Sequence, residues 1–247
     1  FLGTSVTPDL ASFIKEYKPG GVILFSRNLE SVEQMVDLTN DLQACSPLSP
    51  LVISIDQEGG RVSRLPKGFT IFPPCGLLGR CNSAELAYSA AATIAKELKA
   101  VGVNMNTAPV LDVHSNPDNP VIGDRSFGTN PDVVGNLGSA TVAGLQENKV
   151  AACGKHFPGH GDTSTDSHKV LPVVEAQRER LEAVEFPPFR RAVKQGVASI
   201  MTAHVLYQVL DPELPATLSP AIITDFLRRE MQYLSLIHIS EPTRPLY

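Results

Sequence analysis

Residues 130–168 read NPDVVGNLGSATVAGLQENKVAACGKHFPGHGDTSTDSH, and they contain in succession a predicted helix, a predicted strand and a polar loop. Asn130 and the proline after it are typical of a helix start, because the Asn side chain caps free N–H groups and the fixed φ of proline suits the first turn. The helix is predicted to end near Asn148. Residues 150–154 follow at once as a short apolar run, which has the length of a buried strand. The polar residues 155–172 are then predicted to form a loop.

The same alternation of helices and apolar strands extends through the rest of the chain. Further strands are predicted at residues 21–25, 51–56, 103–106 and 197–202, and further helices at residues 31–44, 83–101 and 176–195 and from residue 219 onward. The helix at 176–195 is expected to be strained or broken at Pro187 and Pro188, because a proline inside a helix removes a hydrogen bond. Strands that are apolar on both faces and are each followed by a helix indicate a parallel sheet covered by helices.

Polar, glycine-rich and histidine-rich segments follow the ends of several successive strands. They lie at residues 56–64, 106–127, 155–168 and 202–204. In a (β/α)8 barrel every loop after a strand reaches the same face, whereas an open sheet concentrates its site at one switch point. We therefore predict an α/β fold of the (β/α)8 TIM-barrel type, incomplete, with about six of the eight strand–helix units. Residues 1–233 are expected to form this one barrel domain, partial at both ends.

The composition narrows the class of protein and of partner. The chain has 247 residues, is 43% hydrophobic and 19% charged and has a net charge of −5, which is typical of a soluble globular domain. This charge, without a run of Lys and Arg, argues against a nucleic-acid partner. No segment has the roughly 20 consecutive apolar residues that span a bilayer, so no membrane segment is predicted. The four cysteines show no metal-site or disulfide spacing, which favours a cytoplasmic location.

The loop at residues 155–168 carries the densest chemistry in the sequence. It contains three histidines, two aspartates and a lysine, which are more titratable groups than a structural turn needs. Two chemistries suit it: metal binding by His and Asp, or proton transfer by a His. The pair Asp166 and His168 favours proton transfer, because a nearby carboxylate can orient an imidazole and stabilise its charge. Asp112, which follows another apolar run, is a candidate turn cap.

Two segments of this loop resemble a known signature. Residues 155–161 (KHFPGHG) and 166–168 (DSH) are similar to the signature of family 3 glycoside hydrolases, and the DSH ending resembles the β-N-acetylglucosaminidase branch used in bacterial peptidoglycan recycling. Further matches follow in the order of the family, at residues 20–25 (GGVILF), 56–62 (DQEGGRV), 108–113 (APVLDV) and 123–128 (GDRSFG). The resemblance covers residues 20–229. It implies a (β/α)8 barrel and a two-step retaining mechanism through a covalent glycosyl-enzyme.

The resemblance also implies roles for individual residues. His168 would be the acid/base and Asp166 its partner, while the sugar hydroxyls would be held by Asp56, Arg64, Arg125, Lys155 and His156. No cofactor and no metal is implied. The implied partner is a carbohydrate that ends in β-linked N-acetylglucosamine, such as a muropeptide or a chito-oligosaccharide. The absence of Trp and the 6% aromatic content fit a small pocket for one terminal sugar rather than a long stacking cleft.

The end of the sequence departs from the family pattern. In the family, the segment that matches residues 222–231 continues into a strand that ends in the nucleophilic Asp. Here that place falls near Ser240, with Glu241 beside it, and no Asp is present. Residues 234–247 resemble translated sequencing-adapter read-through, so we predict a non-native tail. A chain without its nucleophile is predicted to lack hydrolysis, and an incomplete barrel to fold poorly.

Three alternatives remain open at this stage. One is a β-glucosidase or xylosidase of the same superfamily, which the DSH ending disfavours. Another is a metal-dependent hydrolase that uses His156, His160, Asp162 and His168. The last is a sugar-binding protein without catalysis.

Overall fold

The computed structural model describes residues 1–165 and 171–239. Its elements, in chain order, are α1 (Pro8–Tyr17), β1 (Gly21–Leu24), η1 (Ser26–Asn28), α2 (Val32–Ala44), β2 (Val52–Ile55), α3 (Cys75–Cys81), α4 (Ala84–Ala100), β3 (Met105–Asn106), η2 (Gly123–Arg125), α5 (Pro131–Glu147), β4 (Ala151–Phe157), β5 (Val173–Val174), α6 (Arg178–Ala183), α7 (Phe186–Lys194), β6 (Ser199–Thr202), β7 (Leu206–Tyr207), the π-helical η3 (Ala221–Glu230) and β8 (Leu236–His238).

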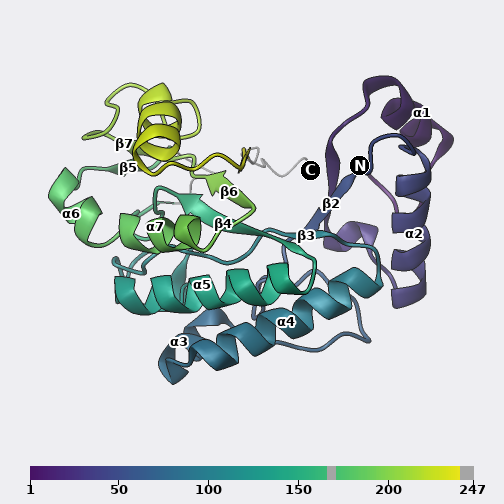
Figure 1. The fold of residues 1–247 in the computed structure, drawn as a ribbon, viewed down its shortest axis with the longest axis horizontal. Helices are drawn as coiled ribbons and strands as arrows, with labels where there is room; N and C mark the ends of the chain where they lie inside the picture. The colour runs from purple at the N-terminus through teal and green to yellow at the C-terminus, as the bar shows by residue number, and fades with distance from the viewer. Residues whose placement is uncertain (166–170, 240–247) are drawn as a thin grey trace.

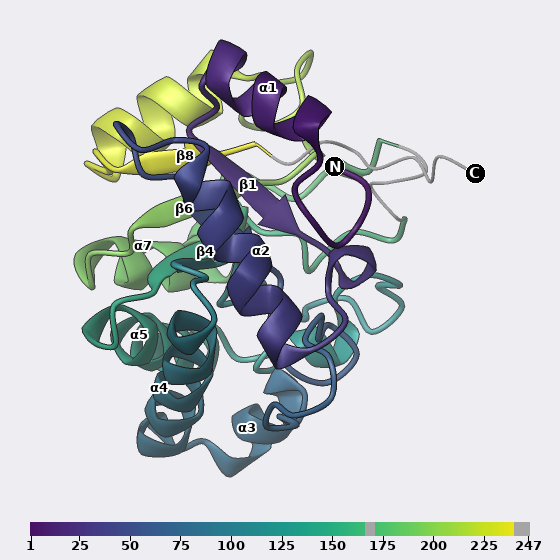
Figure 2. The same cartoon turned by 90° about the vertical axis from the view of Figure 1, so that its right-hand side faces the viewer.

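The main sheet has six strands in the order β1-β2-β3-β4-β6-β8, and every neighbouring pair is parallel. It is curled, with helices α2, α4, α5 and α7 on its outer face (Figures 1 and 2). This is the incomplete (β/α) barrel that the alternation of strands and helices predicts, since parallel strands need crossover connections. A separate pair, β5 and β7, lies outside this sheet.

Most predicted elements are confirmed, with instructive differences at their bounds. Strand β4 continues to Phe157, so Lys155 and His156 lie on the strand and not in the loop that was predicted to begin there. The predicted helix at 176–195 is two helices, and Pro187 and Pro188 lie in the first turn of α7, where a missing N–H costs little. Helices α1 and α3 and the short pair β5 and β7 were not predicted.

Strand β8 falls inside the segment predicted to be a non-native tail. Leu236 pairs in register with Ser199 of β6, and His238 with Met201. Ser235 also donates a hydrogen bond to the carbonyl oxygen of Ala198. Residues 236–238 thus form the last strand of the sheet in this structure. The non-native origin of the segment remains a prediction, and residues 240–247 lie outside the described part.

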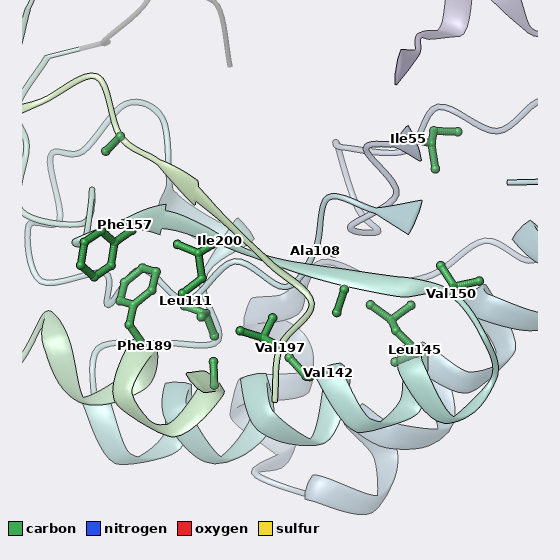
Figure 3. Close-up of a cluster of buried hydrophobic side chains, with 14 of the residues drawn as sticks. Ile55, Ala108, Leu111, Val142, Leu145, Val150, Phe157, Phe189, Val197 and Ile200 are labelled. Carbon is green, nitrogen blue, oxygen red and sulfur yellow. The ribbon is translucent and has the colours of Figure 1, made fainter. Parts of the chain in front are cut away.

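The core lies between the sheet and its helices and fixes the strand ends that carry polar groups. Figure 3 shows buried side chains from strands and helices packed together, among them Phe157, Phe189 and Leu111, each fully buried. The rings of Phe157 and Phe189 meet edge to face with centroids 5.3 Å apart. Burial of one such side chain stabilises the fold by about 1.5–3 kcal/mol. The β4 backbone that carries Lys155 and His156 is therefore anchored by the next residue, Phe157.

None of the described helices has both the length and the apolar character needed to cross a membrane.

Candidate active site

One cavity of about 220 Å³ lies where the strands of the main sheet end. Its wall is built by residues that follow β1, β2 and β6, by the end of β4 and by the segment around η2. All five residues predicted to hold sugar hydroxyls line it: Asp56, Arg64, Arg125, Lys155 and His156. They come from three separate segments of the sequence, so the curled sheet is what brings them together. The predicted acid/base His168 and its partner Asp166 lie outside the described residues.

A cluster of alternating charges forms the floor of this cavity. Lys155 Nζ lies 2.9 Å from Asp56 Oδ1 and 2.6 Å from Glu58 Oε1. Arg125 donates two hydrogen bonds to Glu58, from Nε to Oε2 at 2.9 Å and from Nη2 to Oε1 at 2.8 Å. Arg64 Nη2 lies 3.7 Å from Asp56 Oδ2. Bidentate pairing of this kind fixes direction as well as charge, so Glu58 holds both Lys155 and Arg125 in place.

The electrostatics of the cluster keep its members ionised. Burial raises the pKa of Asp56, but the Lys155 charge and the hydrogen bonds from Thr107 and Lys155 outweigh it and lower the pKa well below its usual range. Burial likewise raises the pKa of Glu58, yet Lys155 and Arg125 lower it to about 2. For Lys155, burial lowers the pKa, and the two carboxylates more than reverse this. The floor therefore offers fixed donors on Lys155 and Arg125 next to a carboxylate acceptor on Asp56.

A second carboxylate, Asp112, organises the histidines of the loop. Its side chain is fully buried. Oδ1 accepts hydrogen bonds from the backbone N–H of His156 at 3.1 Å and of His160 at 2.7 Å. Oδ2 lies 2.7 Å from His156 Nδ1. The interpretation of Asp112 as a simple turn cap is therefore too weak, since it fixes both the backbone and the ring of His156.

The sequence analysis did not predict the roles of Glu58 and Asp112, the two carboxylates that hold other site residues in place. Glu58 lies two positions after Asp56, directly after a strand. That spacing could have suggested that the two side chains point to the same side of the chain. Asp112 follows an apolar run, which was seen, but its partner His156 is 44 residues away. No local pattern reports a pairing at that separation.

Metal binding was the main chemical alternative for this loop. The described part of the chain contains no group of three or more His, Cys, Asp or Glu side chains arranged to hold a metal ion. The predicted ligand set includes His168, which lies outside the described residues. The alternative therefore remains open to the chelation test given below.

Comparison with known proteins identifies the family. The glycosyl hydrolase family 3 N terminal domain matches residues 3–238. The chain belongs to glycosyl hydrolase family 3. This agrees with the resemblance that the KHFPGHG and DSH motifs carry.

Relatives of this family 3 chain are similar over nearly its whole length. Beta-hexosaminidase A of Pseudoalteromonas piscicida is 41% identical over 93% of the chain, which spans 42% of that relative. A β-N-acetylglucosaminidase structure from Paenibacillus sp. str. FPU-7 is 48% identical with a TM-score of 0.95, and the match covers 97% of this chain and 46% of that one. NagZ from Neisseria gonorrhoeae, solved in complex with N-trifluoroacetyl-D-glucosamine, is 36% identical with a TM-score of 0.92, and the match covers 98% and 73% of the two chains. The chain thus spans less than half the length of the first two.

Proposed function

We propose that this chain is the sugar-binding part of an exo-acting β-N-acetylglucosaminidase, whose whole form removes terminal β-linked N-acetylglucosamine from peptidoglycan fragments. The observation that carries the proposal is the convergence of Asp56, Arg64, Arg125, Lys155 and His156 on one small cavity. The names of the relatives, a beta-hexosaminidase and β-N-acetylglucosaminidases, support this sugar class. The glucosamine derivative bound by the gonococcal NagZ points the same way.

The size and lining of the cavity support a single sugar unit. Its volume of about 220 Å³ is below the roughly 300–1,000 Å³ of pockets that take drug-sized ligands. Lys155, Arg64 and Arg125 donate hydrogen bonds and Asp56 accepts them, which suits a ring with several hydroxyl groups. A pocket for one terminal sugar fits exo action. The terminal sugar fills the pocket, and the rest of the glycan extends out of it from the anomeric carbon.

The proposed chemistry is a retaining hydrolysis. A carboxylate attacks the anomeric carbon while an acid protonates the leaving oxygen, and water then cleaves the covalent glycosyl-enzyme. We assign the acid/base role to His168, supported by Asp166, because an imidazole transfers protons readily near neutral pH. The nucleophile has no counterpart in this sequence, so the chain as it stands is expected to bind the sugar and not to hydrolyse it.

Turnover of nitrophenyl-β-N-acetylglucosaminide by two proteins tests the proposal. One is the present chain, and the other has residues 234–247 replaced by the strand, nucleophilic Asp and remaining sequence of a homologous family 3 enzyme. We expect hydrolysis only by the repaired protein, with the N-acetylglucosaminide preferred over the nitrophenyl glucoside. Preference for the glucoside would favour the glucosidase alternative, and loss of turnover on chelation would favour the metal-dependent one. Turnover by the present chain would contradict the proposed mechanism.

A further inference from the structure

We infer that Asp112 fixes the tautomer of His156, so that Nε2 of this ring is an unprotonated acceptor for a sugar hydroxyl. The inference rests on the proposed function for the identity of the ligand. Its structural half, which nitrogen carries the proton, rests on the contacts and charges around the ring and not on the identity of the ligand.

The proton on Nδ1 follows from the chemistry of Asp112. Its two oxygens already receive three contacts, two from backbone N–H groups and one from the ring of His156. Burial raises the pKa of Asp112, but the interactions with His156 and with the backbone of His160 lower it overall, so the group is ionised. An ionised carboxylate only accepts hydrogen bonds. The contact of 2.7 Å with Nδ1 therefore requires that Nδ1 donates.

The surroundings of the ring favour its neutral form, which leaves Nε2 without a proton. Burial lowers the pKa of His156 to about 4, with Asp112 acting in the opposite direction and the charges of Arg125 and Lys155 acting with burial. A neutral imidazole has one donor and one acceptor nitrogen. With Nδ1 as the donor, Nε2 must be the acceptor at neutral pH.

The position of the ring gives this acceptor a use. His156 lines the cavity of about 220 Å³, and its side chain is 16% exposed there. Among the described residues, none forms a hydrogen bond with Nε2. Nε2 is also not one of the fully buried polar atoms that lack a partner, so it is not sealed off from the cavity. It is therefore open to the cavity.

The rest of the wall offers few acceptors, so a second one beside Asp56 has a use for a sugar with several hydroxyl groups. Lys155, Arg64 and Arg125 can only donate, and Glu58 is fully engaged by Lys155 and Arg125. Asp56 accepts from Lys155 and Thr107 through Oδ1, which leaves Oδ2, 3.7 Å from Arg64 Nη2, as its acceptor for a sugar hydroxyl. A sugar hydroxyl that receives a hydrogen bond from these cations must still donate its own proton. His156 Nε2 takes that proton, and a ring with Nε2–H would instead place a donor against a donor.

The substitution Asp112→Asn tests the inference with almost no change in shape. The Asn oxygen can keep both backbone contacts, while its amide group donates to Nδ1 and so moves the ring proton to Nε2. Asp118→Asn is the matched control, because Asp118 is an exposed aspartate of the same segment. Ring nitrogen shifts of histidine-labelled protein distinguish the two tautomers, and a merely structural role for Asp112 does not move them in this direction.

Two readouts are expected to change together. In the unsubstituted chain and in Asp118→Asn, His156 should carry its proton on Nδ1 at neutral pH and the chain should bind N-acetylglucosamine. In Asp112→Asn the proton should move to Nε2, and affinity for N-acetylglucosamine should fall roughly tenfold or more, as for a buried polar group left without its partner.

The inference is overturned if His156 of the unsubstituted chain carries Nε2–H or is cationic at neutral pH. It is also overturned if Asp112→Asn flips the tautomer without loss of affinity. If Asp112→Asn does not fold, the spectrum of the unsubstituted chain still decides the tautomer. Failure of the unsubstituted chain to bind N-acetylglucosamine contradicts the proposed function instead, and the ring nitrogens still show whether Asp112 sets the proton.

Discussion

At the scale of single residues, the charge cluster around Lys155 forms the buried floor of the cavity. The Lys155 side chain is 3% exposed and is neutralised by Asp56 and Glu58. Removal of one partner from a buried ion pair is far more damaging than loss of a surface pair, since it leaves an uncompensated charge. The same groups that hold the fold at this point also present the donors and acceptor of the cavity.

The pKa of Glu58 predicts a specific loss of stability in acid. Its folded pKa of about 2 lies below the ordinary value of 4.5. Glu58 therefore stabilises the fold fully above about pH 4.5, and this contribution is lost as the pH falls from 4.5 towards 2. Its size is on the order of 3 kcal/mol. We expect the free energy of unfolding in urea to fall more steeply between pH 5 and pH 3 for the unsubstituted chain than for Glu58→Gln. Equal slopes would contradict the assignment.

The sequence predicted the individual residues of the site better than it predicted which of them pair with each other. Asp56, Lys155 and His156 stand in dense polar motifs after strands, and such positions point to a site. Glu58 and Arg125 are 67 residues apart, and Asp112 and His156 are 44 apart. These pairings depend on how the sheet curls, so no local spacing could predict them.

At the scale of elements, close backbone packing holds the loop after β4. A methyl group added at Gly161 would lie 1.6 Å from the carbonyl oxygen of Val113, so only hydrogen fits there. The hydroxyl of Tyr207 donates a hydrogen bond to the carbonyl oxygen of Gly159 and fixes the loop from its other side. The loop is thus held by contacts with the segment after β3 on one side and with strand β7 on the other.

Gly161→Ala is therefore expected to destabilise the chain. Overpacking of this kind costs about 1–3 kcal/mol, because the loop or the Val113 backbone must shift. The thermal midpoint should fall, whereas Gly20→Ala, where an added methyl group meets nothing within 4 Å, should leave it nearly unchanged. An unchanged midpoint for Gly161→Ala would show that the loop is free to move away.

Where the ends of helices and strands differ from the prediction, the difference has a physical reason. Strand β4 was expected to end at residue 154, because a buried strand rarely continues through a Lys and a His. It continues because Asp56, Glu58 and Asp112 neutralise or hydrogen-bond those side chains. The break at Pro187 and Pro188 was correctly placed, since proline excludes a helix interior by covalent structure alone.

At the scale of the whole molecule, the sheet is curled and has two outer strands. The type of fold was predictable because strands and helices alternate along the entire chain. Residues of the outer strands β1 and β8 line a common cavity of about 350 Å³. Leu236 of β8 is 53% exposed. Outer strands have backbone N–H and C=O groups without a partner strand, which favours pairing with a strand of another chain.

We therefore expect the purified chain to associate with itself. Its weight-average mass in sedimentation equilibrium should rise with concentration, and Leu236→Lys on the β8 edge should reduce this rise. Leu218→Lys, at another exposed leucine, is the control and should have no such effect. A constant monomer mass across the concentration range would contradict this expectation.

Calorimetric titration of N-acetylglucosamine into the purified chain tests most directly whether the residues at the strand ends form a sugar site. Arg64→Met removes a cavity donor that lies 3.7 Å from Asp56, its one ion-pair partner among the described residues. Arg80→Met changes an exposed arginine outside the cavity. We predict binding by the unsubstituted chain and by Arg80→Met, and binding weaker by roughly tenfold for Arg64→Met, the cost of a lost hydrogen bond to a charged group. Equal binding by all three proteins, or none by the unsubstituted chain, would contradict the assignment of this cavity.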